Sequence, residues 1–139
     1  MKDISAQEAY ERMRADPSVV YLDVRSTPEF KAGRPLGAIS VPLMERGILG
    51  RMAPNPLFLD QVKQKISSDR EVICGCQMGG RSQRACELMQ RIGYTDLSNI
   101  RGGFGGSPDQ PGWSQLGLPV SADAGPGVGY ESLLEKAKK

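Results

Sequence analysis

The chain has 139 residues, of which 39% are hydrophobic and 24% charged, and its formal net charge is +2. This length fits one domain with a single core, and the charge shows no basic excess of the kind that binds nucleic acid. No apolar run approaches the ~20 residues of a membrane span, and the N-terminal stretch MKDISAQEAY lacks the apolar core of a secretory signal. We therefore expect a cytoplasmic protein that binds neither nucleic acid nor membrane.

Helical and strand patterns alternate along the chain. Helices are indicated by apolar side chains that recur every three or four residues behind capping residues, and strands by short apolar runs rich in β-branched residues. The predicted helices are residues 5–15, a short turn at 27–30 that is capped by Thr27 and ended by Gly33, a segment with Leu57, Phe58, Val62 and Ile66 on its apolar face, and residues 82–92. The predicted strands are residues 19–24, 37–42, 71–74 and 96–100, and the Gly- and Pro-rich residues 47–56 are expected to be a surface loop.

This alternation predicts an α/β fold, an open and mainly parallel sheet with helices on both faces, because parallel neighbours need crossover connections. Residues 1–121 are expected to form the domain. After them the composition changes to the linker-like ADAGPGVG and the charged YESLLEKAKK. Residues 122–139 are therefore expected to be a linker and a short C-terminal tail, which can dock on the domain, bind a protein partner or stay in solvent.

The chain has three cysteines and no histidine. The odd count, with one residue between Cys74 and Cys76, argues against a disulfide framework. The spacing fits no Cys-x-x-Cys pair, so neither a metal nor another cofactor is expected. Cys74 on a predicted strand and Cys86 on a predicted helix are interpreted as small, buried core residues.

Cys76 belongs to the segment CGCQMGGRS, in which a predicted strand turns into a predicted helix. Ligands of open α/β sheets usually bind at such a turn. Gly79 and Gly80 allow the backbone to curl so that N–H groups point inward, and the helix N-terminus adds partial positive charge. Such a cradle stabilises a thiolate, because thiol pKa values fall from about 8.5 to as low as about 3.5 at helix N-termini or beside cations. With Arg81 nearby, Cys76 is predicted to be a nucleophile that needs no imidazole base.

The loop CQMGGRS resembles the active-site loop of the rhodanese sulfurtransferases, whose single-domain members often carry Cys-x-x-Gly-x-Arg followed by Ser. The upstream stretch YLDVRSTPEFKAGRPLGAISVP is similar to the family's Asp-Val-Arg, Glu-Phe and Gly-Ala-Ile signature, and IRGGFGGSPDQPGWSQLGLPV to its downstream Gly-Gly and Trp segment. These stretches lie between residues 21 and 120, and the resemblance is taken to cover about residues 4–120. One position departs from the family pattern: Arg34 stands before Pro35 where the family commonly has His, and this change leaves the nucleophile in place.

The resemblance implies a rhodanese-like sulfurtransferase with Cys76 as its catalytic residue. Cys76 is then expected to take a sulfane sulfur from thiosulfate or from an organic or protein-bound persulfide, and to pass it to cyanide or a thiol. The active-site loop that binds the substrate consists of Gln77, Met78, Gly79, Gly80, Arg81 and Ser82. The loop carries no charge before its arginine, so we expect a donor less charged than the thiosulfate dianion. Amides from Gln77 to Arg81 are expected to point at the sulfur.

Asp23 and Arg25, at the end of a predicted strand, are second candidates near the cysteine loop, although an ion pair from Arg25 to Glu29 explains the arginine equally well. Arg81 can orient an anionic donor or tie the loop together through hydrogen bonds, and we favour the second. By family analogy Phe104 and Trp113 also lie near the loop, as wall or core residues.

Two other functions are considered. The first is a non-catalytic rhodanese-like module that binds or regulates a protein partner, against which the presence of Cys76 argues. The second is a phosphatase or arsenate reductase of the same fold. Such enzymes surround a tetrahedral oxyanion with five residues between cysteine and arginine, whereas four separate Cys76 from Arg81. The loop also offers no acid to protonate a leaving group.

Overall fold

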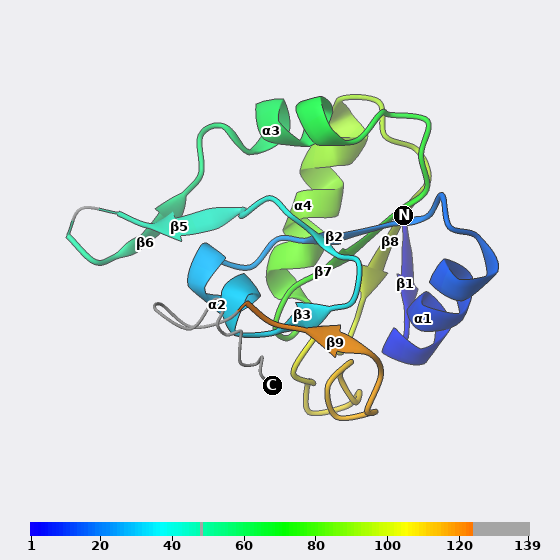
Figure 1. The fold of residues 1–139 in the computed structure, drawn as a ribbon. Helices are drawn as coiled ribbons and strands as arrows, with labels where there is room; N and C mark the ends of the chain where they lie inside the picture. The colour runs from blue at the N-terminus through cyan, green and yellow to red at the C-terminus, as the bar shows by residue number, and fades with distance from the viewer. Residues whose placement is uncertain (48, 124–139) are drawn as a thin grey trace.

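A five-stranded sheet forms the centre of the computed structural model, which describes residues 1–47 and 49–123 (Figure 1). The predicted tail lies outside the described residues, apart from residues 122 and 123. The strands are β1 (Lys2–Ile4), β2 (Val20–Asp23), β4 (Ile39–Ser40), β7 (Val72–Gly75) and β8 (Leu97–Ile100), in the order β1-β8-β7-β2-β4. Every neighbouring pair is parallel. The predicted α/β fold is therefore confirmed.

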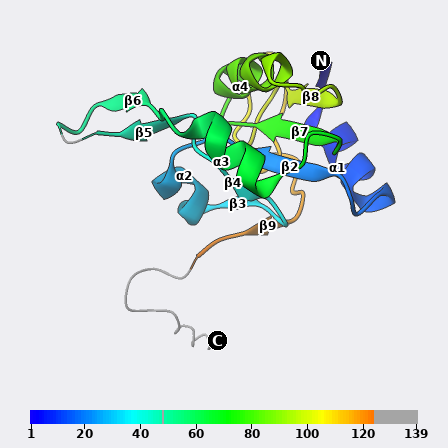
Figure 2. The same cartoon turned by 90° about the horizontal axis from the view of Figure 1, so that it is seen from above.

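Helices cover both faces of this sheet, as Figure 2 shows. The helices are α1 (Ala6–Ala15), α2 (Thr27–Ala32), α3 (Phe58–Lys65) and α4 (Gly80–Arg91). α3 and α4 pack on one face, and α1 lies on the other together with the short antiparallel pair of β3 (Arg34–Pro35) and β9 (Val120–Ser121). In the described part of the chain, no helix is long and apolar enough to cross a bilayer.

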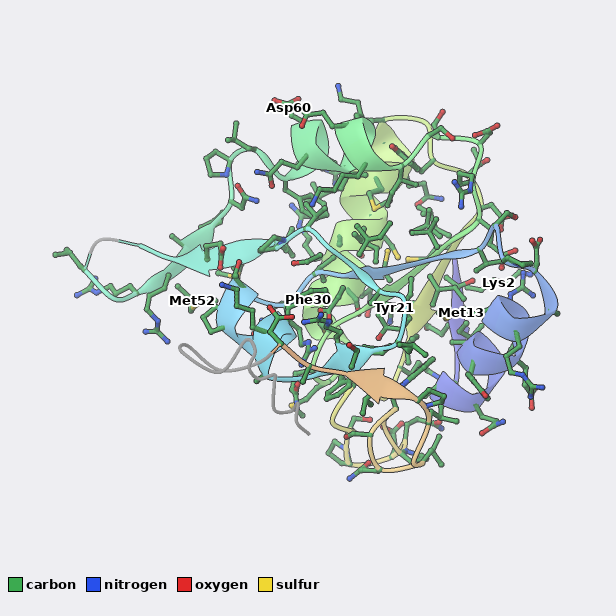
Figure 3. The ribbon with its side chains drawn as sticks, viewed as in Figure 1. Lys2, Met13, Tyr21, Phe30, Met52 and Asp60 are labelled. Carbon is green, nitrogen blue, oxygen red and sulfur yellow. The ribbon has the colours of Figure 1, made fainter. Side chains whose placement is uncertain are left out.

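Alternation along the central strands produces two cores. Successive strand residues point to opposite faces. Leu22 and Cys74 accordingly belong to the core under α3 and α4, whereas Tyr21 and Ile73 belong to the core under α1. Figure 3 shows Tyr21 inside the molecule, on the central ribbon. Because both faces are covered, every residue of β2 and of β7 is buried, as a strand in a parallel sheet requires.

The segment predicted as a loop, residues 47–56, contains the turn and the second strand of a β-hairpin. β5 (Met44–Arg46) pairs antiparallel with β6 (Met52–Pro54), and the hairpin projects from the body of the molecule (Figure 1). The turn is closed by the Gly47 N–H, which donates to the carbonyl of Arg51 at 2.7 Å, and by Gly50, whose φ is +77°. All three residues of β6 are exposed, and Figure 3 shows Met52 at the projecting hairpin. The strand therefore has no alternation of buried and exposed residues from which it could be predicted.

Three helix details also differ from the prediction. Ser26 rather than Thr27 is the N-cap of α2, and α4 begins two residues earlier than predicted, at Gly80. Leu57 is not on the buried face of α3: it precedes the helix as its N-cap and is 53% exposed, while Phe58 and Val62 are buried. The helical spacing of Phe58 and Val62 was predicted correctly. The helix begins one residue after Leu57, however, so Leu57 lies in solvent.

Candidate active site

The cysteine loop joins β7 to α4. β7 ends at Gly75, Cys76 follows, and Gly79 forms the N-cap of α4 with φ at +117°. A Cβ at Gly79 would lie 2.5 Å from the carbonyl oxygen of Arg101. Both the backbone conformation and the close approach therefore require glycine at this position.

Two donors point at the sulfur of Cys76. The N–H of Gly79 donates to Sγ at 3.1 Å, and the hydroxyl of Ser82 lies 3.4 Å from it. The sequence predicted that several amides between Gln77 and Arg81 would donate hydrogen bonds to the sulfur. Among the described residues, Gly79 supplies the one amide that does so. The sulfur also stands at the N-terminus of α4, where the partial positive charge of a helix favours an anion.

The sulfur lies beneath the loop rather than at its surface. Cys76 is 2% exposed, whereas Met78 beside it is largely exposed. Reactive cysteines usually stand in partially exposed surroundings. In this structure the covering groups therefore close the Cys76 sulfur off from solvent.

A second glycine-rich segment holds the outer side of the loop. The carbonyl of Cys76 accepts from the N–H of Phe104 at 2.7 Å, and that of Gln77 accepts from the N–H of Gly105 at 3.0 Å. A Cβ at Gly103, whose φ is +61°, would lie 2.5 Å from both carbonyl oxygens. The segment of the Gly-Gly motif, which the sequence analysis noted only through the family resemblance, thus binds two carbonyls of the cysteine loop through main-chain hydrogen bonds.

Arg81 ties the loop to α2. Its two terminal nitrogens donate to the two carboxylate oxygens of Glu29 at 2.8 and 3.1 Å. These hydrogen bonds are the main cause that lowers the pKa of Glu29 from 4.5 to about 2, and the backbone N–H and hydroxyl of Ser26 assist. This geometry agrees with the tying role favoured for Arg81. Glu29 is a residue of the site that sequence reasoning assigned to the wrong partner.

Arg25 pairs with Asp23, so the predicted ion pair from Arg25 to Glu29 is wrong. Both residues of the actual pair are buried, and Arg25 donates to the Asp23 carboxylate from Nε at 3.0 Å and from Nη2 at 2.8 Å. Nη1 of Arg25 also donates to Oε1 of Gln77 at 3.3 Å, and the guanidinium stacks on Phe104 at 4.4 Å from the ring centroid. Asp23 and Arg25 thus lie beside the cysteine loop and contact it through Gln77.

Two hollows flank the ion pair of Glu29 and Arg81. One, of about 470 Å³, is lined by Arg25, Glu29, Ala32, Gly33, Gln77 and Phe104. The other, of about 460 Å³, is lined by Ser26, Pro28, Glu29, Met44, Arg46, Met52 and Arg81. The first includes the residue that follows Cys76, and the second lies between α2 and the hairpin of β5 and β6.

The other cysteines and Trp113 lie in the cores. Cys74 and Cys86 are fully buried, and a hydrogen bond with Cys86, followed by burial, raises the pKa of the Cys74 thiol well above its ordinary value. Trp113 packs edge-on against Tyr10 and Tyr21 in the core under α1. Within residues 1–47 and 49–123, no group of three His, Cys, Asp or Glu side chains is placed to hold a metal ion.

Fold and site together define a class: an α/β domain with a single cysteine loop at the carboxyl end of a central parallel strand, closed by a helix N-terminus. The family model described as Rhodanese-like domain matches residues 5–106. The chain belongs to the rhodanese-like domain family.

Relatives and solved structures agree with this assignment. The chain is 42% identical over 102 residues to Thiosulfate sulfurtransferase 16, chloroplastic, of Arabidopsis thaliana. The matched region covers 73% of this chain and 79% of that protein. The chain is 27% identical over 125 residues to a protein named Sulfurtransferase from Allochromatium vinosum, covering 90% and 99%. The crystal structure of Rv0390 from M. tuberculosis superposes with a TM-score of 0.74 at 28% identity, covering 87% and 97%. The chain spans only 49% to 62% of four other plant relatives.

Proposed function

We propose that the protein is a sulfurtransferase that carries sulfane sulfur as a persulfide on Cys76. The observation that carries the proposal is the hydrogen bond from the Gly79 N–H to Sγ at the first turn of α4. Main-chain donors and a helix N-terminus stabilise a thiolate and also the larger, softer persulfide anion. Relatives named as sulfurtransferases support the reaction class.

The proposed reaction has two displacements at sulfur. The Cys76 thiolate attacks the outer sulfur of the donor, an S–S bond forms, and the donor's own bond to that sulfur breaks, so that sulfite or a thiolate leaves with the electron pair. A nucleophilic acceptor, cyanide or a thiolate, then attacks the terminal sulfur of the persulfide. The bond between the two sulfurs breaks and returns its electron pair to Cys76. Neither displacement requires a proton to be abstracted once the thiolate exists.

We further propose that the donor carries little charge, as an organic or protein-bound persulfide does. Arg25 is paired with Asp23, and Arg81 is paired with Glu29. The hollow beside Gln77 therefore offers a dianion no uncompensated cation among its lining residues. We expect the KM for thiosulfate to be well above that for a cysteine-peptide persulfide. A thiosulfate KM in the low micromolar range would contradict this donor preference.

The activity is tested by thiocyanate formation from a sulfane donor and cyanide. The wild-type protein should form thiocyanate, Cys76→Ser should form none, and Cys86→Ser serves as the matched control that retains the activity. A non-catalytic module predicts no thiocyanate from any of the three. Hydrolysis of an aryl phosphate that is lost in Cys76→Ser would support the phosphatase alternative instead.

The domain boundary near residue 121, the cytoplasmic location and a protein partner for the tail stay predictions. Limited proteolysis tests the first of them. A protease should remove the tail and leave a fragment that ends near residue 121, with its thiocyanate-forming activity intact. A fragment that loses activity together with the tail would contradict the boundary.

A further inference from the structure

A buried polar side chain of β8 lies behind the cysteine loop and is not explained by packing. Asn99 is 2% exposed. Its Oδ1 accepts from the hydroxyl of Ser82, and its Nδ2 donates to the Asp3 carboxylate at 3.2 Å. Asp3 and Asn99 are register partners in the pairing of β1 with β8. Since an ionised carboxylate only accepts, Asp3 fixes the amide with its carbonyl oxygen towards Ser82.

The Ser82 hydroxyl has more acceptors than protons. Its oxygen lies within hydrogen-bond distance of Asn99 Oδ1, of the Gly79 carbonyl at 3.1 Å and of Cys76 Sγ at 3.4 Å. A hydroxyl donates one proton at a time, so these acceptors compete for it. Ser82 is fully buried, so its hydroxyl is shielded from bulk solvent. A hydrogen bond in such surroundings is stronger than one in water.

We propose that Asn99 is a positioning residue for the sulfur chemistry: its carbonyl competes with Cys76 Sγ for the Ser82 proton, and Asp3 fixes the direction of that carbonyl. The inference rests on the proposed function in taking Cys76 as the sulfur carrier. A negatively charged sulfur attracts the proton through a charge-assisted bond, and a neutral sulfur leaves it with Asn99. Asn99 thereby keeps the hydroxyl from stabilising the sulfur anion fully, which preserves the reactivity of that anion.

Substitutions of Asp3 test the inference most directly, because this side chain is exposed and its removal leaves no cavity in the core. The measurement is the rate of Cys76 alkylation by iodoacetamide against pH, with the modified residue located by tandem mass spectrometry. In Asp3→Ala the Asn99 amide can turn and donate to Ser82, so the midpoint of the profile should fall by about half a pH unit. Asp3→Glu, the matched control, keeps a carboxylate that only accepts, and its midpoint should equal that of the wild type.

Asn99→Leu removes the competing acceptor altogether and should lower the midpoint at least as far as Asp3→Ala. In a Ser82→Ala background neither change should shift the midpoint, because the proton in question is gone. Tyr21 on β2, Cys74 on β7 and Arg81 on α4 are titratable or charged groups close enough to Cys76 to interact with it electrostatically, and all three stay unchanged in these variants.

Several outcomes would overturn the inference. These are an unshifted midpoint in Asp3→Ala, an equal shift in Asp3→Glu, and shifts that persist when Ser82 is replaced. If Asn99→Leu does not fold, the Asp3 and Ser82 variants still decide the matter. Failure of the proposed function is a separate result: the wild-type protein would then form no persulfide, whatever its alkylation profile.

Discussion

Two neighbouring glycines of the cysteine loop differ in what they tolerate. Gly79 has φ at +117° and no room for a Cβ, whereas a Cβ at Gly80 would meet nothing within 4 Å. Gly79→Ala should lower the free energy of unfolding by about 1–3 kcal/mol and, by moving its N–H away from the Cys76 sulfur, lower kcat by about tenfold or more. Gly80→Ala should stay within about 0.5 kcal/mol of the wild type in a denaturant titration. Equal losses in both would contradict the geometry of the loop.

The pKa of Glu29 predicts how stability depends on pH. A carboxylate whose pKa in the folded state is lowered, here from 4.5 to about 2, stabilises the fold above its ordinary pKa, and this contribution is lost as the pH falls towards 2. The side chain is 34% exposed, so we expect Glu29→Gln to cost no more than about 1 kcal/mol at neutral pH. Thermal unfolding at a series of pH values should show the two proteins converging below pH 4.5. Parallel curves would show that the ion pair contributes nothing.

Residue types and spacing placed Cys76 in a loop between a strand and a helix, as the structure has it, but they did not identify the partners of this loop. Arg81 follows Cys76 closely in the chain, whereas Glu29 is 52 residues away from Arg81 and one of 16 acidic residues. Asn99 lies 17 residues after Ser82, on a different element. Nothing in the local pattern selects such pairs, because they are created by the crossing of strands and helices.

At the scale of elements, α3 shows how a boundary decides which apolar residue is buried. Phe58 is 2% exposed and Leu57 is 53% exposed, although both are adjacent apolar residues. Phe58→Ala should therefore cost about 3–5 kcal/mol, and Leu57→Ala should stay within about 0.5 kcal/mol of the wild type. Equilibrium unfolding in urea measures both. A large loss in Leu57→Ala would mean that the helix begins earlier and buries this residue.

The long elements with a buried face were predicted well, whereas several short strands with few buried residues were missed. The helix at α1 and the strands at β2, β7 and β8 were evident from periodicity and apolar runs, because tertiary burial selects those residues. β1 has one buried residue in three, and β6 has none. Such strands are held by main-chain hydrogen bonds to a neighbouring strand. Their side chains therefore show no apolar pattern from which a strand can be predicted.

At the scale of the whole molecule, the alternation of helix and strand predicted a parallel sheet but not its strand order. The order β1-β8-β7-β2-β4 places the N-terminal strand beside the last strand of the central sheet. It also brings the end of β7 between the ends of β2 and β8, so that Arg25 and the segment around Phe104 meet the cysteine loop. The catalytic centre we propose therefore depends on contacts from three regions of the chain.

The central claim, that Cys76 carries the sulfur, is tested most directly by sulfur loading of variants with chosen cysteines. The double variant Cys74→Ala/Cys86→Ala keeps Cys76 as its one cysteine, and Cys76→Ala keeps the other two. After incubation with a persulfide donor or thiosulfate, intact mass should show one added sulfur atom, removable by cyanide, on the double variant and none on Cys76→Ala. Loading of Cys76→Ala, or a folded double variant that takes up no sulfur, would contradict the claim.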